Sequence, residues 1–178
     1  HAIGFSDKNE LKGRYADTTR ENFSRTMVIS CFSFTEVAKR AAALMPGGGS
    51  MITLTFGGSM RVMPNYNVMG VAKAALEASM RYLAADFGPQ NIRVNAISPG
   101  PVRALAGAGI TDARFMFSFQ KDHAPLRRPV SPEGIAGTAL YLLSDLSLDT
   151  TGEIIHVDAG YNIISMPRPE NLKLPNGG

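Results

Sequence analysis

Tyr66 and Lys73 are the residues of this sequence whose types and spacing best suit chemistry. The step from 66 to 73 makes almost two turns of an α-helix, so both side chains leave one face, about 10 Å apart along the axis. A long lysine can reach back across that gap to a ligand that the phenol also touches. Its ammonium group would lower the pKa of the tyrosine and hold a polar group of a cofactor. This spacing also arises by chance, so the surrounding elements decide its meaning.

Three helical patterns, separated by strand patterns, surround the pair. Thr18-Thr19-Arg20-Glu21 has the form of a capping box, and the helix after it is expected to end at Pro46 and Gly47. The second helix is predicted over 65–87, and the third begins at Ser131-Pro132-Glu133. The apolar stripe of the first helix is Phe23, Met27, Cys31, Phe34, Ala38 and Ala41, and the third helix carries Ile135, Ala139, Leu142 and Leu143. Strands are predicted over 50–56, 93–98 and 153–157.

This alternation predicts an α/β fold, a Rossmann-like doubly wound parallel sheet with helices on both faces. Ligands of such sheets sit beyond the carboxyl ends of the strands, so the loops after Ile3, Phe56 and Ser98 are the expected site. His1-Ala2-Ile3-Gly4 reads as the end of a buried strand without an initiator Met. We therefore expect the chain to enter the fold partway, with the N-terminal βαβ portion missing. Residues 1–166 are expected to form one partial domain and 167–178 an irregular tail.

Composition excludes several classes of protein. A hydrophobic fraction of 44% with 19% charged residues is typical of globular domains, and a net charge of +3 from scattered residues does not indicate nucleic-acid binding. The single cysteine, Cys31, forms no internal disulfide and is expected in the core. The three histidines have no metal-like spacing, so no metal site is predicted. No segment is typical of a membrane span or a signal peptide, and a cytoplasmic location is expected.

Two longer motifs give the Tyr-Lys pair a specific context. They are Pro64-Asn65-Tyr66-Asn67-Val68-Met69-Gly70-Val71-Ala72-Lys73-Ala74 and Arg93-Val94-Asn95-Ala96-Ile97-Ser98-Pro99-Gly100-Pro101-Val102-Arg103. Both resemble the enoyl-acyl-carrier-protein reductases of bacterial fatty-acid synthesis, in the short-chain dehydrogenase/reductase superfamily. The resemblance runs from His1 to about Met166. It implies reduction of trans-2-enoyl thioesters by NADH, an acyl-carrier protein as partner, and a homotetramer.

The resemblance also implies roles for individual residues. The Tyr66 phenol would hydrogen-bond the thioester carbonyl and stabilise the developing enolate, and Lys73 would hold the ribose hydroxyls of the nicotinamide half. Cofactor-lining residues would be Ile3, Gly4, Lys73, Gly100, Pro101, Val102 and Ala104. Substrate-lining residues would be Phe56, Tyr66, Met69, Ala106 and Ile110. Met69 also belongs to the apolar stripe of its helix, so core and pocket are equal alternatives for it.

Three departures from the family pattern bear on activity. No Gly-rich pyrophosphate turn is present, so we expect these residues by themselves to bind NADH poorly. Phe56 stands where many relatives carry a second tyrosine, and Ala104 stands where the family often has threonine.

Two other functions stay open. A carbonyl or β-ketoacyl reductase would carry a serine about thirteen residues before the tyrosine, where this chain has Thr53. The other is a non-catalytic scaffold subunit. The basic residues Arg114, Lys121, Arg127 and Arg128 are either a docking surface for an acidic carrier protein or an ordinary solvated surface.

Overall fold

The computed structural model describes residues 1–102 and 113–166. At its centre is a parallel sheet of three strands in the order β1-β2-β3. The strands are β1 (Gly49–Leu54), β2 (Ile92–Pro99) and β3 (Ile154–Val157). The middle strand β2 is buried from Ile92 to Ser98, as expected for a strand covered on both faces.

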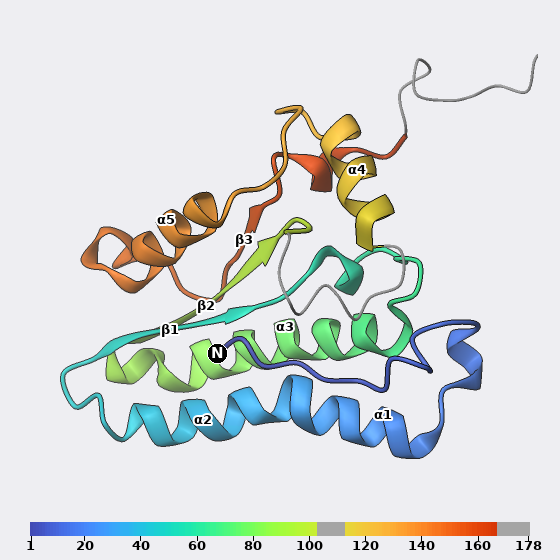
Figure 1. Ribbon diagram of the computed structural model, residues 1–178. Coiled ribbons are helices and arrows are strands. Elements are labelled where there is room, and N and C mark those ends of the chain that lie inside the picture. Colours follow the sequence, from blue (N-terminus) through green and yellow to red (C-terminus); the bar gives the residue numbers. More distant parts are fainter. Residues whose placement is uncertain (103–112, 167–178) are drawn as a thin grey trace, which may run out of the picture.

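Helices cover both faces of the sheet (Figure 1). On one face lie α3 (Asn67–Phe87) and the rod formed by α1 (Arg20–Met27) and α2 (Ser33–Ala42), and α5 (Pro132–Leu143) lies on the other. A further helix, α4 (Ala113–His123), lies beyond the carboxyl end of β2. The core between sheet and helices includes Phe34, Ala38, Met51, Leu76, Met80, Ile92 and Val94. The predicted parallel sheet with helices on both faces is therefore confirmed.

The helical rod over 20–42 contains a π-helical turn, Val28–Phe32, that the sequence analysis did not predict. Apart from Cys31, its buried positions recur every four residues: Asn22, Thr26, Ser30, Phe34, Ala38 and Ala42. Each step of four overshoots a full α-helical turn by about 40°, so a regular helix would rotate this series off the core. The wider π turn offsets that drift. The expected apolar stripe is correct from Cys31 onward, whereas Phe23 is exposed and polar side chains take the buried positions before the turn.

The start of α1 differs from the predicted capping box. The N-cap is Thr19, whose hydroxyl accepts a hydrogen bond from the Asn22 backbone N–H (3.2 Å). Thr18 instead donates to the Tyr15 carbonyl. Glu10 accepts from the Thr19 backbone N–H (2.9 Å), the part that a capping box gives to an acid inside the helix. The carboxylate therefore comes from the preceding loop, which ties that loop to the helix.

Two polar residues of the motif at 93–103 have structural roles. Arg93 is buried and donates to the carbonyls of Leu142 (2.9 Å) and Ser144 (3.0 Å) at the end of α5. Asn95 donates to the Thr150 carbonyl (2.8 Å) and accepts from the Glu153 N–H (3.0 Å). Both residues therefore join β2 to the segments that follow α5.

The third helix begins as predicted and ends differently. Ser131 caps α5 by accepting from the Gly134 N–H (3.2 Å). Leu142 is buried, but Leu143 is 51% exposed, so the predicted apolar stripe is wrong at its last position. The glycines of 106–109 and the predicted tail 167–178 lie outside the described residues.

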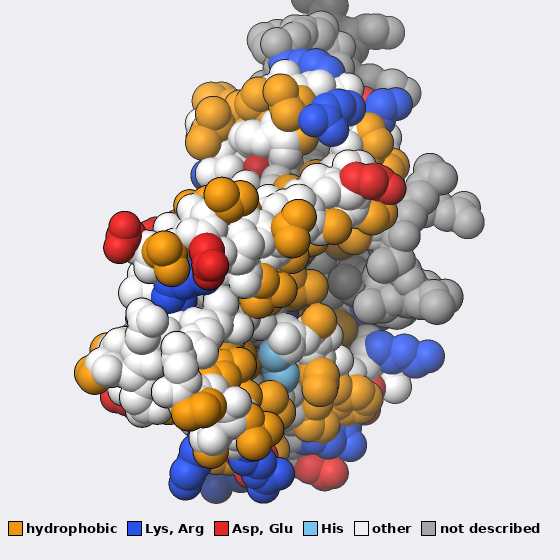
Figure 2. All heavy atoms as spheres, turned by 90° about the vertical axis from the view of Figure 1, so that its left-hand side faces the viewer, with side chains coloured by type: hydrophobic (Ala, Val, Ile, Leu, Met, Phe, Trp, Pro, Cys, Tyr) orange, Lys and Arg blue, Asp and Glu red, His pale blue; other side chains and the backbone are white. Residues whose placement is uncertain are grey.

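The first residue pairs with the outer edge of the sheet. The amino group of His1 donates to the Ile52 carbonyl (2.8 Å), and the Leu54 N–H donates to the His1 carbonyl (3.2 Å). This is the pattern of a parallel strand, although no strand is formed over residues 1–4 and Ile3 is exposed rather than buried. Many hydrophobic side chains gather on this side of the molecule (Figure 2). In the described part of the chain, no helix is long and apolar enough to span a bilayer.

Candidate functional site

Tyr66 lies at the start of α3, beside the carboxyl ends of β1 and β2, and is buried. Asparagines on both sides of it adopt positive φ, 57° at Asn65 and 35° at Asn67, a conformation that asparagine tolerates better than most residues. The Asn67 amide donates to the carbonyls of Glu10 and Gly13, both at 3.3 Å. The irregular entry into α3 is thus fixed from both sides, and it directs Tyr66 inward.

Two glycines make room for the tyrosine ring. A Cβ on Gly58 would lie 2.5 Å from Tyr66 Cδ1, and one on Gly70 would lie 2.6 Å from the Gly58 carbonyl oxygen. On another side, the Phe56 ring meets the Tyr66 ring edge to face, with centroids 5.1 Å apart. Tyr66 is therefore packed on several sides, and any larger residue at 58 or 70 would displace it.

The environment of Tyr66 raises the pKa of its phenol, first through burial and then through the nearby negative charge of Glu77. We expected the opposite direction, from the ammonium group of Lys73. That expectation is wrong, because burial and the charge of Glu77 both raise this pKa. In this structure Tyr66 is therefore a neutral hydrogen-bond donor at physiological pH.

Lys73 is buried one turn further along α3 than Gly70, and its Nζ donates to the Leu54 carbonyl at the end of β1 (2.8 Å). Burial lowers the pKa of Lys73, and the negative charge of Glu77 opposes that effect, as does Cys31. The Cβ position of Gly4 lies 4.0 Å from Lys73 Nζ. The structure therefore brings the predicted residues Gly4 and Lys73 together, with Tyr66 about two turns earlier on the same face of the helix.

Met69 faces the N-terminal segment. Its Cε is 3.5 Å from the Cβ position of Gly4, and its sulfur lies 3.6 Å from the Ser30 hydroxyl. The Ser30 hydroxyl also accepts from the Phe5 N–H (2.9 Å). Met69 is half-buried and lies beside the predicted cofactor segment. It does not line the cavity described next.

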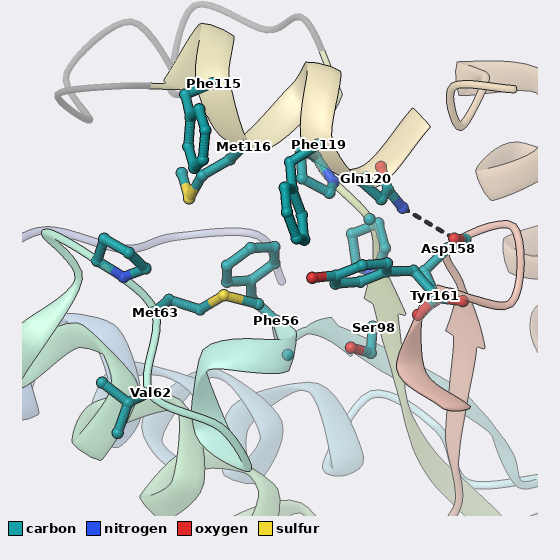
Figure 3. A pocket seen from close by; sticks show the side chains of 15 residues that line it. Phe56, Val62, Met63, Ser98, Phe115, Met116, Phe119, Gln120, Asp158 and Tyr161 are labelled. Atoms are coloured by element: carbon teal, nitrogen blue, oxygen red, sulfur yellow. Dashed lines mark hydrogen bonds between the residues drawn. The ribbon is translucent and has the colours of Figure 1, made fainter. Parts of the chain in front are cut away.

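A cavity of about 340 Å³ opens between α4, the loop after β1 and the loop after β3. Phe56, Met63, Phe115, Met116, Phe119 and Tyr161 converge on it (Figure 3). A volume of this size, lined mainly by apolar side chains with a few polar groups, is typical of a small-molecule site. Phe56 joins the two parts of the site, because its ring lines the cavity and also contacts Tyr66.

The carboxyl end of β2 supplies the opposite wall. Gly100 and Pro101 line the cavity, and the Gly100 N–H donates to the Val157 carbonyl (3.0 Å). A Cβ on Gly100 would lie 2.1 Å from Gln120 Nε2, so α4 packs there only against glycine. Val102 is half-buried at the end of this segment. The predicted site residues Ala104, Ala106 and Ile110 lie outside the described residues.

Three residues near the site were missed by the sequence analysis. Glu77 lies one turn beyond Lys73, Tyr161 contributes a phenol to the cavity, and Arg61 donates to carbonyls of the loop after β3. Only Glu77 had a signal in the sequence, since positions 73 and 77 share a helix face. The other two depend on loop contacts across about a hundred residues. Among the residues that the structure describes, no cluster of His, Cys, Asp and Glu could hold a metal ion.

Comparison with known proteins identifies close relatives. The family model described as "Enoyl-(Acyl carrier protein) reductase" matches residues 1–162. The "Enoyl-[acyl-carrier-protein] reductase [NADH] 2" of Rhizobium meliloti is 74% identical over 174 residues, covering 98% of this chain and 65% of that protein. A second reductase of the same organism, numbered 1, is 60% identical over 93% of this chain and 61% of that protein.

Solved structures give the same result. The FabI crystal structure from Candidatus Liberibacter asiaticus has a TM-score of 0.92 and 62% identity, over 94% of this chain and 65% of that one. The enoyl-acyl-carrier-protein reductase of Anaplasma phagocytophilum, solved in complex with NAD, has a TM-score of 0.91 and 56% identity, over 94% of this chain and 64% of that one. The chain thus spans a little under two thirds of the length of these relatives.

Proposed function

Because the chain belongs to the enoyl-acyl-carrier-protein reductase family, we propose that the protein reduces trans-2-enoyl thioesters of an acyl-carrier protein with NADH. The observation that carries the proposal is the placement of a buried tyrosine and a buried lysine on one face of α3, next to an apolar cavity of about 340 Å³. The cavity suits an acyl chain, and the Tyr66 ring lies directly behind Phe56, which lines the cavity.

The residues around Lys73 fit a nicotinamide dinucleotide. A Cβ at Gly4 would lie 3.5 Å from Met69 Cε and 4.0 Å from Lys73 Nζ, so the backbone at Gly4 lies directly beside the Lys73 ammonium group. When bound, the dinucleotide supplies the hydride. Lys73 would hold its ribose hydroxyls, and backbone of Ile3-Gly4 and Gly100-Pro101-Val102 would line it.

Tyr66 would act on the thioester as a neutral donor. Reduction at the β-carbon places negative charge on the thioester oxygen, and a hydrogen bond from the phenol stabilises that charge. The raised pKa of Tyr66 suits this role, because the phenol keeps its proton throughout the physiological range. Phe56, which lines the cavity and contacts the Tyr66 ring, would contact the substrate near the reacting carbons, whereas Met69 lies on the cofactor side.

The hydroxyls of β1 and its end weaken the alternative of a ketone reductase. Thr53 is buried, and its hydroxyl donates to the His1 carbonyl (3.2 Å). Thr55 is also buried and donates to Glu77. Neither threonine offers its proton to a ketone, so the enoyl substrate is favoured.

The test is NADH oxidation by the protein at its natural length, offered a trans-2-enoyl thioester and, separately, a β-ketoacyl thioester. We expect turnover of the enoyl substrate, and a loss of about a hundredfold in kcat in Tyr66→Phe, since one stabilising donor is removed. Lys73→Ala is expected to raise the KM for NADH and to lower kcat. Tyr82→Phe and Lys39→Ala make the same changes at exposed helix positions and are expected to leave both constants unchanged.

Each other outcome contradicts the proposal in its own way. Turnover of the ketone alone would make the protein a β-ketoacyl reductase. A folded protein that neither binds NADH nor turns over either thioester would be a scaffold subunit. NADPH in place of NADH, in the same assay, measures the cofactor preference.

The proposal extends to the assembly of the protein. A homotetramer is proposed from the family and is supported by Val28 and Phe32, which are 56% and 52% exposed at the π turn. Mass measurement in solution tests it, and a monomer would contradict it. Docking of an acidic carrier protein near Lys121, Arg127 and Arg128, which are exposed, also stays a prediction, as does the cytoplasmic location. The side chain of Arg114 lies outside the described residues.

A further inference from the structure

Glu77 is a buried carboxylate that the mechanism above does not use. It lies in the middle of α3 and is 7% exposed. In the described part of the chain its one hydrogen-bond partner is the hydroxyl of Thr55, just beyond β1. A buried carboxylate with a single neutral partner is costly unless a cation lies nearby. Its position therefore calls for a charge partner.

Lys73 is the cation that meets this need. Residues 73 and 77 are four apart on α3, so their side chains lie on one face, one above the other. Both are held by the carboxyl end of β1, Lys73 through the Leu54 carbonyl (2.8 Å) and Glu77 through Thr55. The contacts at the end of one strand thus hold both charged groups on the face of α3 that meets β1, and in the described part of the chain the two form no direct ion pair.

The same carboxylate bears on Tyr66. Steps of seven and four residues from Tyr66 to Lys73 to Glu77 keep the three positions close to one line along the helix. The other group that acts on Lys73 is the Cys31 thiol, from the π turn packed against α3. Glu77 is the carboxylate among the groups that act on both Tyr66 and Lys73.

We propose that Glu77 is a positioning residue that keeps Lys73 as an ammonium group and Tyr66 as a neutral phenol. A negative charge nearby makes it harder for either group to lose its proton, so both stay protonated to higher pH. Without this charge both groups would lose their protons at lower pH. Lys73 would then bind the cofactor less well, and Tyr66 could no longer donate a hydrogen bond. The catalytic part of this inference rests on the proposed function, whereas the electrostatic part does not.

The experiment compares wild type with Glu77→Gln at natural length. Glutamine keeps an acceptor for Thr55 and removes only the charge. The ionisation of Lys73 is followed by NMR of isotope-labelled lysine side chains, assigned with Lys73→Arg, and the pH profile of kcat/KM is measured for the enoyl thioester. We expect both the Lys73 titration and the alkaline limb of the profile to move to lower pH, with roughly a tenfold loss of kcat/KM on that limb and little change near neutrality.

Glu36→Gln is the matched control, because it makes the same change on the exposed side of α2 and is expected to move neither curve. If Glu77→Gln fails to fold, Glu77→Asp and Glu77→Asn repeat the comparison of charged and neutral side chains one methylene shorter. An unchanged Lys73 titration in the neutral variants would overturn the inference. The wild type could lack enoyl turnover while Glu77→Gln still moves the Lys73 titration to lower pH. That result would support the inference and reject the proposed function.

Discussion

At the scale of single residues, two glycines determine the position of Tyr66. Gly58 touches the Tyr66 ring, and Gly70 touches the backbone of Gly58. Close approach of backbone to an aromatic ring restricts where that ring can lie, so packing contacts hold the phenol in place. The glycines of the loop and helix therefore determine where the Tyr66 phenol lies.

Gly58→Ala tests this packing. The added methyl would lie 2.5 Å from the Tyr66 ring, so the ring must shift, and we expect a fall of at least tenfold in kcat with a loss of about 1–3 kcal/mol in stability. Gly57→Ala is the control, because its methyl would meet only Met63 Cε at 3.7 Å. Enzyme kinetics and thermal unfolding measure the two effects. Equal kinetics in both variants would show that the ring is free to move.

Helix α5 shows how a polar residue holds an element in place. Arg93 projects from β2 to the last turn of α5 and to the segment beyond it, where it donates to two carbonyls and to the Ser147 hydroxyl (2.6 Å). Helix C-termini leave carbonyls without partners, and a buried guanidinium satisfies several of them at once. The arginine thus locks the helix to the middle strand of the sheet.

Arg93→Ala removes this lock. It leaves the carbonyls of Leu142 and Ser144 without that donor in a buried environment, and we expect the free energy of unfolding to fall by about 2–4 kcal/mol. Arg81→Ala, on the exposed side of α3, is expected to change it by less than about 0.5 kcal/mol. Denaturant unfolding measures both. Similar values for the two variants would contradict the proposed role of Arg93.

At the scale of the whole molecule, the cavity depends on contacts between distant parts of the chain. Arg61, in the loop after β1, donates to the carbonyls of Ile164 (2.8 Å) and Asn162, in the loop after β3. The second loop carries Tyr161. Burial raises the pKa of its phenol, and the positive charge of Arg61 partly opposes that effect. A single exposed arginine thus joins the two loops that wall the cavity.

Arg61→Ala is expected to widen the cavity without unfolding the protein. The KM for the enoyl thioester should rise roughly threefold to tenfold, the effect of losing one or two hydrogen bonds, whereas the melting temperature stays near that of wild type. Arg81→Ala is again the control. An unchanged KM would mean that the loops keep their positions without the arginine.

The sequence predicted those features that depend on local pattern. The parallel sheet, the helix over 67–87, the Ser131 cap and the proximity of Tyr66 to Lys73 follow from periodicity and spacing. The π turn was missed because the apolar residues of this helix recur at steps of three and four, which a regular α-helix also explains. The direction of the Tyr66 pKa shift was wrong because burial depends on Phe56 and Gly58, which lie outside the helix. Contacts of Arg61 could not be predicted, since they join residues about a hundred positions apart.

The buried side chains of the helical rod over 20–42 are polar in its first half and apolar in its second half, so we expect the two halves to differ in local stability. Before the π turn its buried positions are Asn22 and Thr26, the turn itself buries Ser30 and Cys31, and after it they are Phe34, Ala38 and Ala42. Polar contacts lose little when water replaces them, whereas the apolar half cannot open without exposing the core. We therefore expect the first half of the rod to open more readily, and to exchange its amide hydrogens with solvent sooner, than the second half. Because the Ser30 hydroxyl accepts from the Phe5 N–H, opening at Ser30 would also release the segment beside Gly4.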